Sequence, residues 1–175
     1  MRKVIMIRGN SGSGKTTIAK HLQREFGQDT MMLSQDTIRG QIVLDKTGRD
    51  RLVVEAMISL IEFAYKNELT VIVEGVMNSE YYTPLFNRIK DLYKTRICAY
   101  YFDLTREETF KRHQNSDKST MFGEAEMRIW WKEDYLSDIP EKMIDETMSV
   151  EDIAEMIYKD MNYHKRRRIN IGDDE

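Results

Sequence analysis

The chain has 175 residues, of which 41% are hydrophobic and 33% charged, as is typical of one soluble globular domain. Its net charge of −3 argues against a protein that binds nucleic acid through overall charge, and its single cysteine, Cys98, excludes an internal disulfide and a cysteine-rich zinc site. No apolar run approaches the roughly 18 residues of a membrane span, so we expect neither a membrane segment nor a signal peptide, and we take the cytoplasm as the compartment.

Short apolar segments alternate with longer segments of helical periodicity along the chain. The predicted strands are residues 3–8, 30–34, 70–74, 96–102 and 142–146. The predicted helices are residues 15–26, 36–44, 50–67, 80–93, 105–114, 123–136 and 149–161. This alternation indicates an α/β fold whose parallel sheet is covered by helices on both faces.

The first predicted strand leads into a glycine-rich loop that fits the phosphate-binding pattern G-x-x-x-x-G-K-[ST] at every position. Its residues are Gly9, Asn10, Ser11, Gly12, Ser13, Gly14, Lys15 and Thr16. A strand before the loop and a helix after it are the context in which this pattern forms a P-loop, rather than a plain Gly/Ser turn. We expect these residues, with Thr17, to bind nucleotide phosphates, and we expect Lys15 to reach the β- and γ-phosphates and Thr16 to bind Mg²⁺.

Asp36 and Arg39 follow the second predicted strand. Ligands of such sheets gather at the carboxyl ends of the strands, so Asp36 is placed to take the proton of an acceptor hydroxyl. Arg39 lies one helical turn further and could hold an anionic part of the acceptor. The structural alternative is an aspartate at the start of a helix, paired with an arginine of the same helix.

Glu74 ends the third predicted strand, where a carboxylate of a P-loop enzyme would bind Mg²⁺ directly or through water. The alternative is an ordinary surface glutamate at a strand end, but Gly75 immediately after it suggests a close approach of another chain segment. Tyr81, Tyr82 and Phe86 begin the next predicted helix and could line the acceptor pocket.

A polar stretch without apolar periodicity, about residues 113–122, is typical of a mobile lid. Arg112 at its base is our first candidate for the cation that stabilises the transferred charge, and Lys118 is the second. Trp130 and Trp131 follow the lid, and we expect one of them to pack in the core, with base stacking as the alternative.

The chain is expected to form a kinase domain over residues 1–162 and a charged tail over residues 163–175. The tail holds a basic run, 164–168, and ends in three acidic residues. A solvated chain end is our interpretation, and an arm that contacts nucleic acid is the alternative.

The P-loop, the pair Asp36 and Arg39, the run Val73-Glu74-Gly75 and residues 105–112 together resemble the small P-loop kinases of the nucleoside-monophosphate-kinase superfamily. Within it the chain is most similar to zeta-toxin-like kinases, chloramphenicol phosphotransferase and the kinase domain of polynucleotide kinase. The resemblance implies a three-layer αβα P-loop NTPase fold with a lid, a five-stranded parallel sheet in the order 2-3-1-4-5, and ATP with Mg²⁺ as the donor.

The resemblance also implies roles for single residues. The catalytic base of these kinases corresponds to Asp36, and the arginine that holds the substrate phosphate in polynucleotide kinases corresponds to Arg39. Lid arginines of the family come in pairs about four residues apart. Arg112 matches the first, but Ser116 stands at the second position, which leaves Lys118 as the substitute.

These observations favour an ATP-dependent kinase that phosphorylates a hydroxyl of a small-molecule or nucleotide-like acceptor. One alternative is a 5′-hydroxyl polynucleotide kinase, so nucleic acid is a possible but not a favoured partner. Another, of a different class, is a regulatory protein that binds ATP as a switch. We expect no membrane partner, and the sequence leaves the oligomeric state open.

Overall fold

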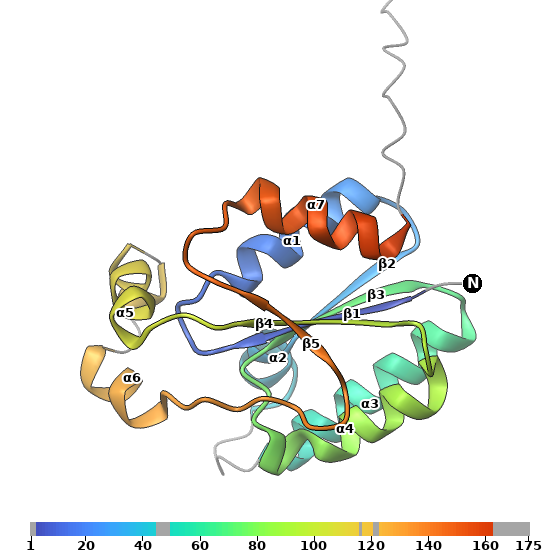
Figure 1. The fold of residues 1–175 in the computed structure, drawn as a ribbon. Helices are drawn as coiled ribbons and strands as arrows, with labels where there is room; N and C mark the ends of the chain where they lie inside the picture. The colour runs from blue at the N-terminus through green and yellow to red at the C-terminus, as the bar shows by residue number, and fades with distance from the viewer. Residues whose placement is uncertain (1–2, 45–49, 116, 121–122, 163–175) are drawn as a thin grey trace, which may run out of the picture.

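A computed structural model describes residues 3–44, 50–115, 117–120 and 123–162 (Figure 1). The strands are β1 (Val4–Gly9), β2 (Thr30–Ser34), β3 (Thr70–Gly75), β4 (Ile97–Phe102) and β5 (Glu141–Ile144). The α-helices are α1 (Lys15–Phe26), α2 (Gln35–Thr37), α3 (Arg51–Lys66), α4 (Ser79–Tyr93), α5 (Arg106–Gln114), α6 (Glu124–Trp130) and α7 (Val150–Met161). A π-helical turn, η1 (Ile38–Ile42), continues α2, and a 3-10 turn, η2 (Asp117–Thr120), follows α5.

The strands form one parallel sheet in the order β2-β3-β1-β4-β5, which confirms the predicted topology. The central strand β1 pairs with β3 and β4, and its four apolar residues are fully buried. Val4 and Met6 point to one face and Ile5 and Ile7 to the other. A strand buried on both faces needs an unbroken apolar run, which is why β1 does not alternate with polar residues.

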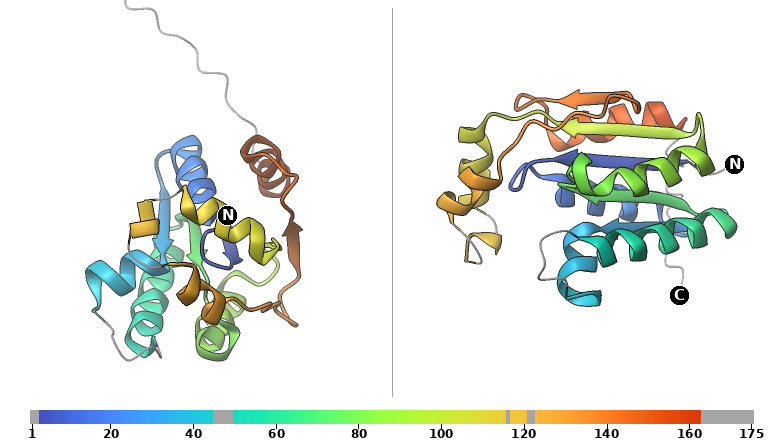
Figure 2. Two further views of the ribbon diagram at one scale, coloured as in Figure 1. Left: turned by 90° about the vertical axis from the view of Figure 1, so that its left-hand side faces the viewer. Right: turned by 90° about the horizontal axis from the view of Figure 1, so that it is seen from below.

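Helices cover both faces of the sheet, so the predicted three-layer arrangement is also confirmed. α1 and α7 lie on one face, and α3 and α4 lie on the other (Figure 1). α5 and α6 lie beyond the sheet, at the end where β1 and β4 finish (Figure 2). The P-loop begins at this end of the sheet, so the fold places it near α5 and α6.

Two predicted helices differ in the structure. The predicted helix 36–44 is a single turn, α2, followed by η1. The predicted helix 123–136 is wrong beyond Trp130, because residues 131–136 are extended. In place of helical bonds, the backbone of this segment bonds to Asn10, Tyr101 and Glu141. Tertiary hydrogen bonds therefore outweigh a helical sequence preference, which is a weak signal.

In the part of the chain that the structure describes, none of the helices has the length and apolar character needed to cross a membrane. The predicted tail, 163–175, lies outside the described residues.

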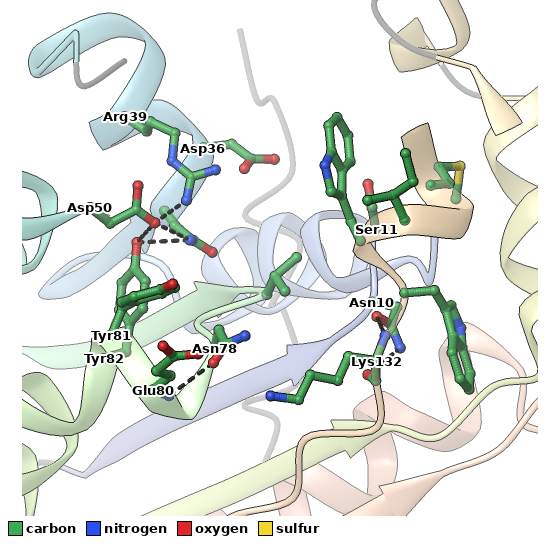
Figure 3. Close-up of a pocket in the computed structure, with 16 residues that line it drawn as sticks. Asn10, Ser11, Asp36, Arg39, Asp50, Asn78, Glu80, Tyr81, Tyr82 and Lys132 are labelled. Atoms are coloured by element: carbon green, nitrogen blue, oxygen red, sulfur yellow. Dashed lines mark hydrogen bonds and ion pairs between the residues drawn. The ribbon is translucent and has the colours of Figure 1, made fainter. Parts of the chain in front are cut away.

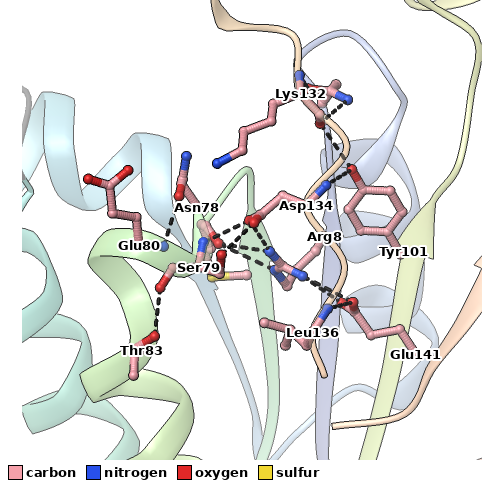
Figure 4. A network of polar contacts seen from close by, with 12 residues as sticks. Arg8, Asn78, Ser79, Glu80, Thr83, Tyr101, Lys132, Asp134, Leu136 and Glu141 are labelled. Atoms are coloured by element: carbon pink, nitrogen blue, oxygen red, sulfur yellow. Dashed lines mark hydrogen bonds and ion pairs between the residues drawn. The ribbon is translucent and has the colours of Figure 1, made fainter. Parts of the chain in front are cut away.

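Arg8 connects the sheet to the extended segment 131–136 (Figure 4). It belongs to β1 and is completely buried. Its guanidinium lies 2.6 Å from Asp134 and 2.9 Å from Glu141, donates to the carbonyl of Met77, and lies over the ring of Phe86. Asp134 in turn accepts hydrogen bonds from the backbone and hydroxyl of Ser79, at the start of α4. A buried arginine is tolerated only when its charge and donors are satisfied in this way.

We expect Glu141→Gln to lower the free energy of unfolding by about 3 kcal/mol, because it removes a charge that compensates buried Arg8. The control is Glu155→Gln, since Glu155 forms an exposed pair with Lys159 that should contribute less than about 1 kcal/mol. Urea denaturation of both variants measures the difference. Equal values for the two variants would contradict the role given to Arg8.

Candidate functional site

The P-loop connects β1 to α1 and leaves the first turn of α1 open to an anion. α1 begins after Gly14, which has a φ of 104° and forms no side-chain cap, and its first turn contains no acidic residue. Gly12 has a φ of 80°, and a Cβ there would lie 2.6 Å from the carbonyl oxygen of Thr109. The helix end therefore keeps its partial positive charge and its first amides for a ligand.

Lys15 is folded into the loop. Its ammonium donates to the carbonyl of Asn10 at 2.6 Å and to the hydroxyl of Ser13 at 3.2 Å, and only 7% of the residue is exposed. The loop therefore holds a buried positive charge in a setting of carbonyl and hydroxyl oxygens. Ser11 lies at the rim of the loop, and Thr17 is exposed on α1.

Thr16 and Glu74 lie side by side, although 58 residues separate them. The Thr16 hydroxyl lies 3.2 Å from Oε2 of Glu74. Glu74 is 2% exposed, and its Oε1 is buried without a hydrogen-bond partner among the described residues. An orphaned carboxylate oxygen next to a hydroxyl at the edge of a phosphate loop fits Mg²⁺, which takes few protein ligands and completes its shell with phosphate and water. No cluster of three or more acidic, histidine or cysteine ligands occurs in the described ranges.

A cleft of about 830 Å³ opens beside the P-loop, at the carboxyl ends of β1, β2 and β3 (Figure 3). Asn10 and Ser11 of the P-loop form part of its wall, and Asp36 and Arg39 form another part. The start of α4, the end of α6 and the segment after α6 complete it. The loop and Asp36 therefore face a common space in this cleft.

Asp36 lies in the first turn of α2, and its side chain is exposed and directed into the cleft (Figure 3). Arg39 forms an ion pair with Asp50, a residue that sequence reasoning did not single out, instead of the helix-internal pair with Asp36 that was the structural alternative. Burial works against the charge of Arg39, but the hydrogen bond and the charge of Asp50 outweigh it and hold the pKa of Arg39 above its usual value. Arg39 is therefore a fixed cation at the cleft wall.

A buried hydrogen-bond network holds Asp50 in place. Gln35 donates to Asp50 and to the hydroxyl of Tyr82, and its carbonyl oxygen accepts from the backbone of Met77 at 3.0 Å. Tyr82 donates to Asp50 at 2.7 Å. Burial raises the pKa of the Tyr82 phenol far above its usual value, and the bond to Asp50 adds to this, so Tyr82 remains a donor at all physiological pH values. Gly75 makes room for this network, since a Cβ there would lie 2.6 Å from that of Gln35.

Aromatic side chains line the cleft on two sides. Tyr81 and Tyr82 line it as expected, but Phe86 is buried in the core instead. The expectation that one tryptophan packs in the core is wrong, because Trp130 is 55% exposed and both Trp130 and Trp131 line the cleft. The helix that would have turned one of them inward ends at Trp130.

Arg112 contacts the P-loop from α5 and does not line the cleft. It donates to the carbonyl of Ser13 at 3.0 Å and to Glu108 at 2.7 Å. The predicted lid, about 113–122, is described at 113–115 and 117–120, where η2 forms part of it. The side chain of Lys118 and residue 116 lie outside the described structure, so neither can be placed relative to Arg112.

Sequence reasoning missed Asp50 and Lys132 as cleft residues. Asp50 carried no motif and stands 14 residues after Asp36. Lys132 was assigned to a helix that ends two residues earlier. The polar residues around it, with no apolar period, were the available signal for an extended segment.

Comparison with known proteins agrees with this fold. A family model described as AAA domain matches residues 4–127. Among solved structures, a sugar kinase from Janibacter sp. HTCC2649 superposes with a TM-score of 0.71 at 15% identity, covering 94% of this chain and 97% of its own.

The APS kinase CysC of Mycobacterium tuberculosis, in complex with AMPPNP and APS, superposes with a TM-score of 0.68 at 17% identity. The superposition covers 92% of this chain and 98% of the APS kinase. A gluconokinase from Sinorhizobium meliloti 1021 superposes with a TM-score of 0.67 at 11% identity. The superposition covers 93% of this chain and 94% of the gluconokinase. No curated protein matches the chain. The family match and the shared fold confirm the resemblance to small P-loop kinases.

We expect Gly75→Ala to lower the free energy of unfolding by about 1–3 kcal/mol, because the new Cβ displaces Gln35 from its network with Asp50 and Tyr82. Gly40→Ala is the matched control, since a Cβ on Gly40 meets no atom within 4 Å. It should change stability by less than about 1 kcal/mol. Urea denaturation measures both variants, and a neutral Gly75→Ala would show that Gln35 can move without cost.

Proposed function

Since the chain belongs to the AAA domain family, we propose that it is an ATP-dependent kinase that transfers the γ-phosphoryl group to a hydroxyl of a small-molecule or nucleotide-like acceptor. One observation carries the proposal: the P-loop residues Asn10 and Ser11 and the carboxylate of Asp36 line the same cleft. A phosphate loop alone serves switches and motors as well as kinases, whereas a carboxylate facing it across a cleft suits an acceptor hydroxyl.

The donor phosphates would lie at the amino end of α1. Lys15 then exchanges its bonds to Asn10 and Ser13 for phosphate oxygens, which are better partners for its charge. The other P-loop residues, from Gly9 to Thr17, supply backbone amides and hydroxyls. Arg112, bonded to the carbonyl of Ser13, adds positive charge behind the loop, and its action on the transferred group stays a prediction.

In the proposed reaction, Asp36 accepts the proton of the acceptor hydroxyl. The acceptor oxygen forms a bond to the γ-phosphorus, while the bond between that phosphorus and the bridging oxygen of ADP breaks, and ADP leaves with the electron pair. Arg39 would orient the acceptor from the same side as Asp36. Mg²⁺ held by Thr16 and Glu74 would neutralise charge on the donor phosphates.

The similar structures support this class of reaction, because the sugar kinase, the gluconokinase and the APS kinase are all named as kinases. A set of hydroxyl compounds tests it directly: nucleosides, sugars, aminoglycosides, chloramphenicol and 5′-hydroxyl oligonucleotides, each with ATP and Mg²⁺. Stimulated ADP release identifies a kinase, and stimulation by oligonucleotides alone would identify a polynucleotide kinase. ATP binding without stimulation by any compound would favour the regulatory switch.

We expect Asp36→Asn to lower the acceptor-stimulated rate of ADP release at least about a hundredfold, because the amide cannot take the hydroxyl proton. ATP affinity, measured by calorimetry, should stay within about threefold. Asp91→Asn is the control, since Asp91 is an exposed carboxylate near the end of α4. An unchanged stimulated rate in Asp36→Asn would show that another group acts as the base.

We expect Glu74→Gln to remove most of the Mg²⁺-dependent part of the thermal stabilisation by ATP and to leave the Mg²⁺-independent part. Lys15→Ala should lose both parts, because Lys15 contacts the phosphates themselves. Glu68→Gln, an exposed position just before the same strand, is the control. Melting curves with ATP, in the presence of Mg²⁺ or of EDTA, measure the effect. Full retention of the Mg²⁺-dependent part in Glu74→Gln would rule Glu74 out as a ligand.

A further inference from the structure

Lys132 is a cation in the cleft to which the proposed reaction gives no role. It belongs to the extended segment after α6, and its side chain reaches across the cleft toward Asn78 and Glu80 (Figure 3). Within the described ranges its ammonium takes part in no ion pair. A lysine that lines a cleft without a carboxylate partner keeps its charge and all three donors for a ligand.

The main chain of Lys132 is hydrogen-bonded through both its N–H and its carbonyl. Its carbonyl accepts from the side-chain amide of Asn10 at 2.9 Å, and its N–H donates to the same amide at 3.0 Å. The hydroxyl of Tyr101 donates to the same carbonyl at 3.3 Å. Asp134, two residues on, is bound to buried Arg8. Both backbone polar groups of Lys132 are thus bonded, and this ordering of the main chain before binding lowers the entropy cost of binding a ligand.

Arg39 is a second cation at the same cleft, and part of its guanidinium is also unused. One terminal nitrogen pairs with Asp50, but Nε is buried and has no hydrogen-bond partner among the described residues. The carboxylate of Asp50 offsets part of the attraction of Arg39 for an anion, whereas Lys132 has no ion pair within the described ranges. Lys132 is therefore the stronger attraction for an anion in this cleft.

We infer that Lys132 binds an anionic group, a carboxylate or a phosphate, on the acceptor, and that Asn10 positions it for this. The inference rests on the proposed kinase function and gives its acceptor a chemical class: a hydroxyl compound that carries a negative charge. Asp36 does not conflict with this, because it faces the hydroxyl that reacts. Glu80 also lines the cleft and would favour a cationic acceptor, which the experiment includes as a competing outcome.

The experiment compares hydroxyl compounds of related structure that carry different charges. D-gluconate and glucose 6-phosphate supply the two anions on a sugar scaffold, D-glucose is neutral and D-glucosamine is cationic; AMP with adenosine gives a second matched pair. We expect ADP release with ATP and Mg²⁺ to be stimulated by anionic members, and the responding pair tells carboxylate from phosphate. For the best anionic acceptor, Lys132→Met should raise KM about tenfold or more with little change in kcat, and Lys132→Arg should restore most of the loss.

The control variant is Lys66→Met, an exposed lysine at the opposite end of α3 from Asp50, which should behave as the unaltered protein. Stimulation by neutral or cationic members alone overturns the inference and leaves the kinase proposal intact. The same conclusion follows if Lys132→Met has an unchanged KM. Stimulation by none of these members but by a compound of the wider set also overturns the inference. If no compound of either set stimulates ADP release while ATP still binds, the kinase proposal fails and this inference fails with it.

Discussion

The buried charge of Arg8 is the constraint on which the rest of the site depends. A guanidinium in the central strand cannot be left without partners, so the chain must bring Asp134 and Glu141 to it. These two acids come from the segments just before β5 and within it. Satisfying one cation therefore fixes the path of residues 131–136 along the sheet end, and with it one wall of the cleft.

On the opposite wall, uncharged side chains hold the carboxylate of Asp50 in place. Gln35, Tyr82 and the room left by Gly75 hold this carboxylate under Arg39. The P-loop lies between the two walls, with the Thr16 and Glu74 pair behind it. Both sides of the cleft are thus held by hydrogen bonds and ion pairs within the protein, which suits the proposed reaction because phosphoryl transfer depends on alignment more than on covalent chemistry.

The alternation of apolar segments predicted a parallel sheet covered on both faces, and a motif with strict backbone requirements predicted the P-loop, whereas the order of the strands came from the resemblance to small P-loop kinases. The sequence could not place the cleft wall formed by Lys132, since the stretch after α6 was predicted as helix and long-range bonds to Arg8, Asn10, Tyr101 and Glu141 override that preference. Asp50 was missed for a similar reason: its partner Gln35 becomes its neighbour only in the folded chain. The local pattern of residues predicts helices and strands. Polar contacts between residues far apart in the sequence decide which side chains at the ends of those elements reach the cleft.

Asn10 touches both halves of the site at once, through its carbonyl to Lys15 and through its side chain to Lys132. In the proposed kinase, a nucleotide that draws Lys15 away from this carbonyl would disturb the residue that anchors the segment of Lys132. Linkage then requires reciprocity: whatever the first ligand does to the affinity for the second, the second does equally to the affinity for the first. Saturation curves for the two proposed substrates would in that case be interdependent, with an energetic coupling that passes through a single residue, Asn10.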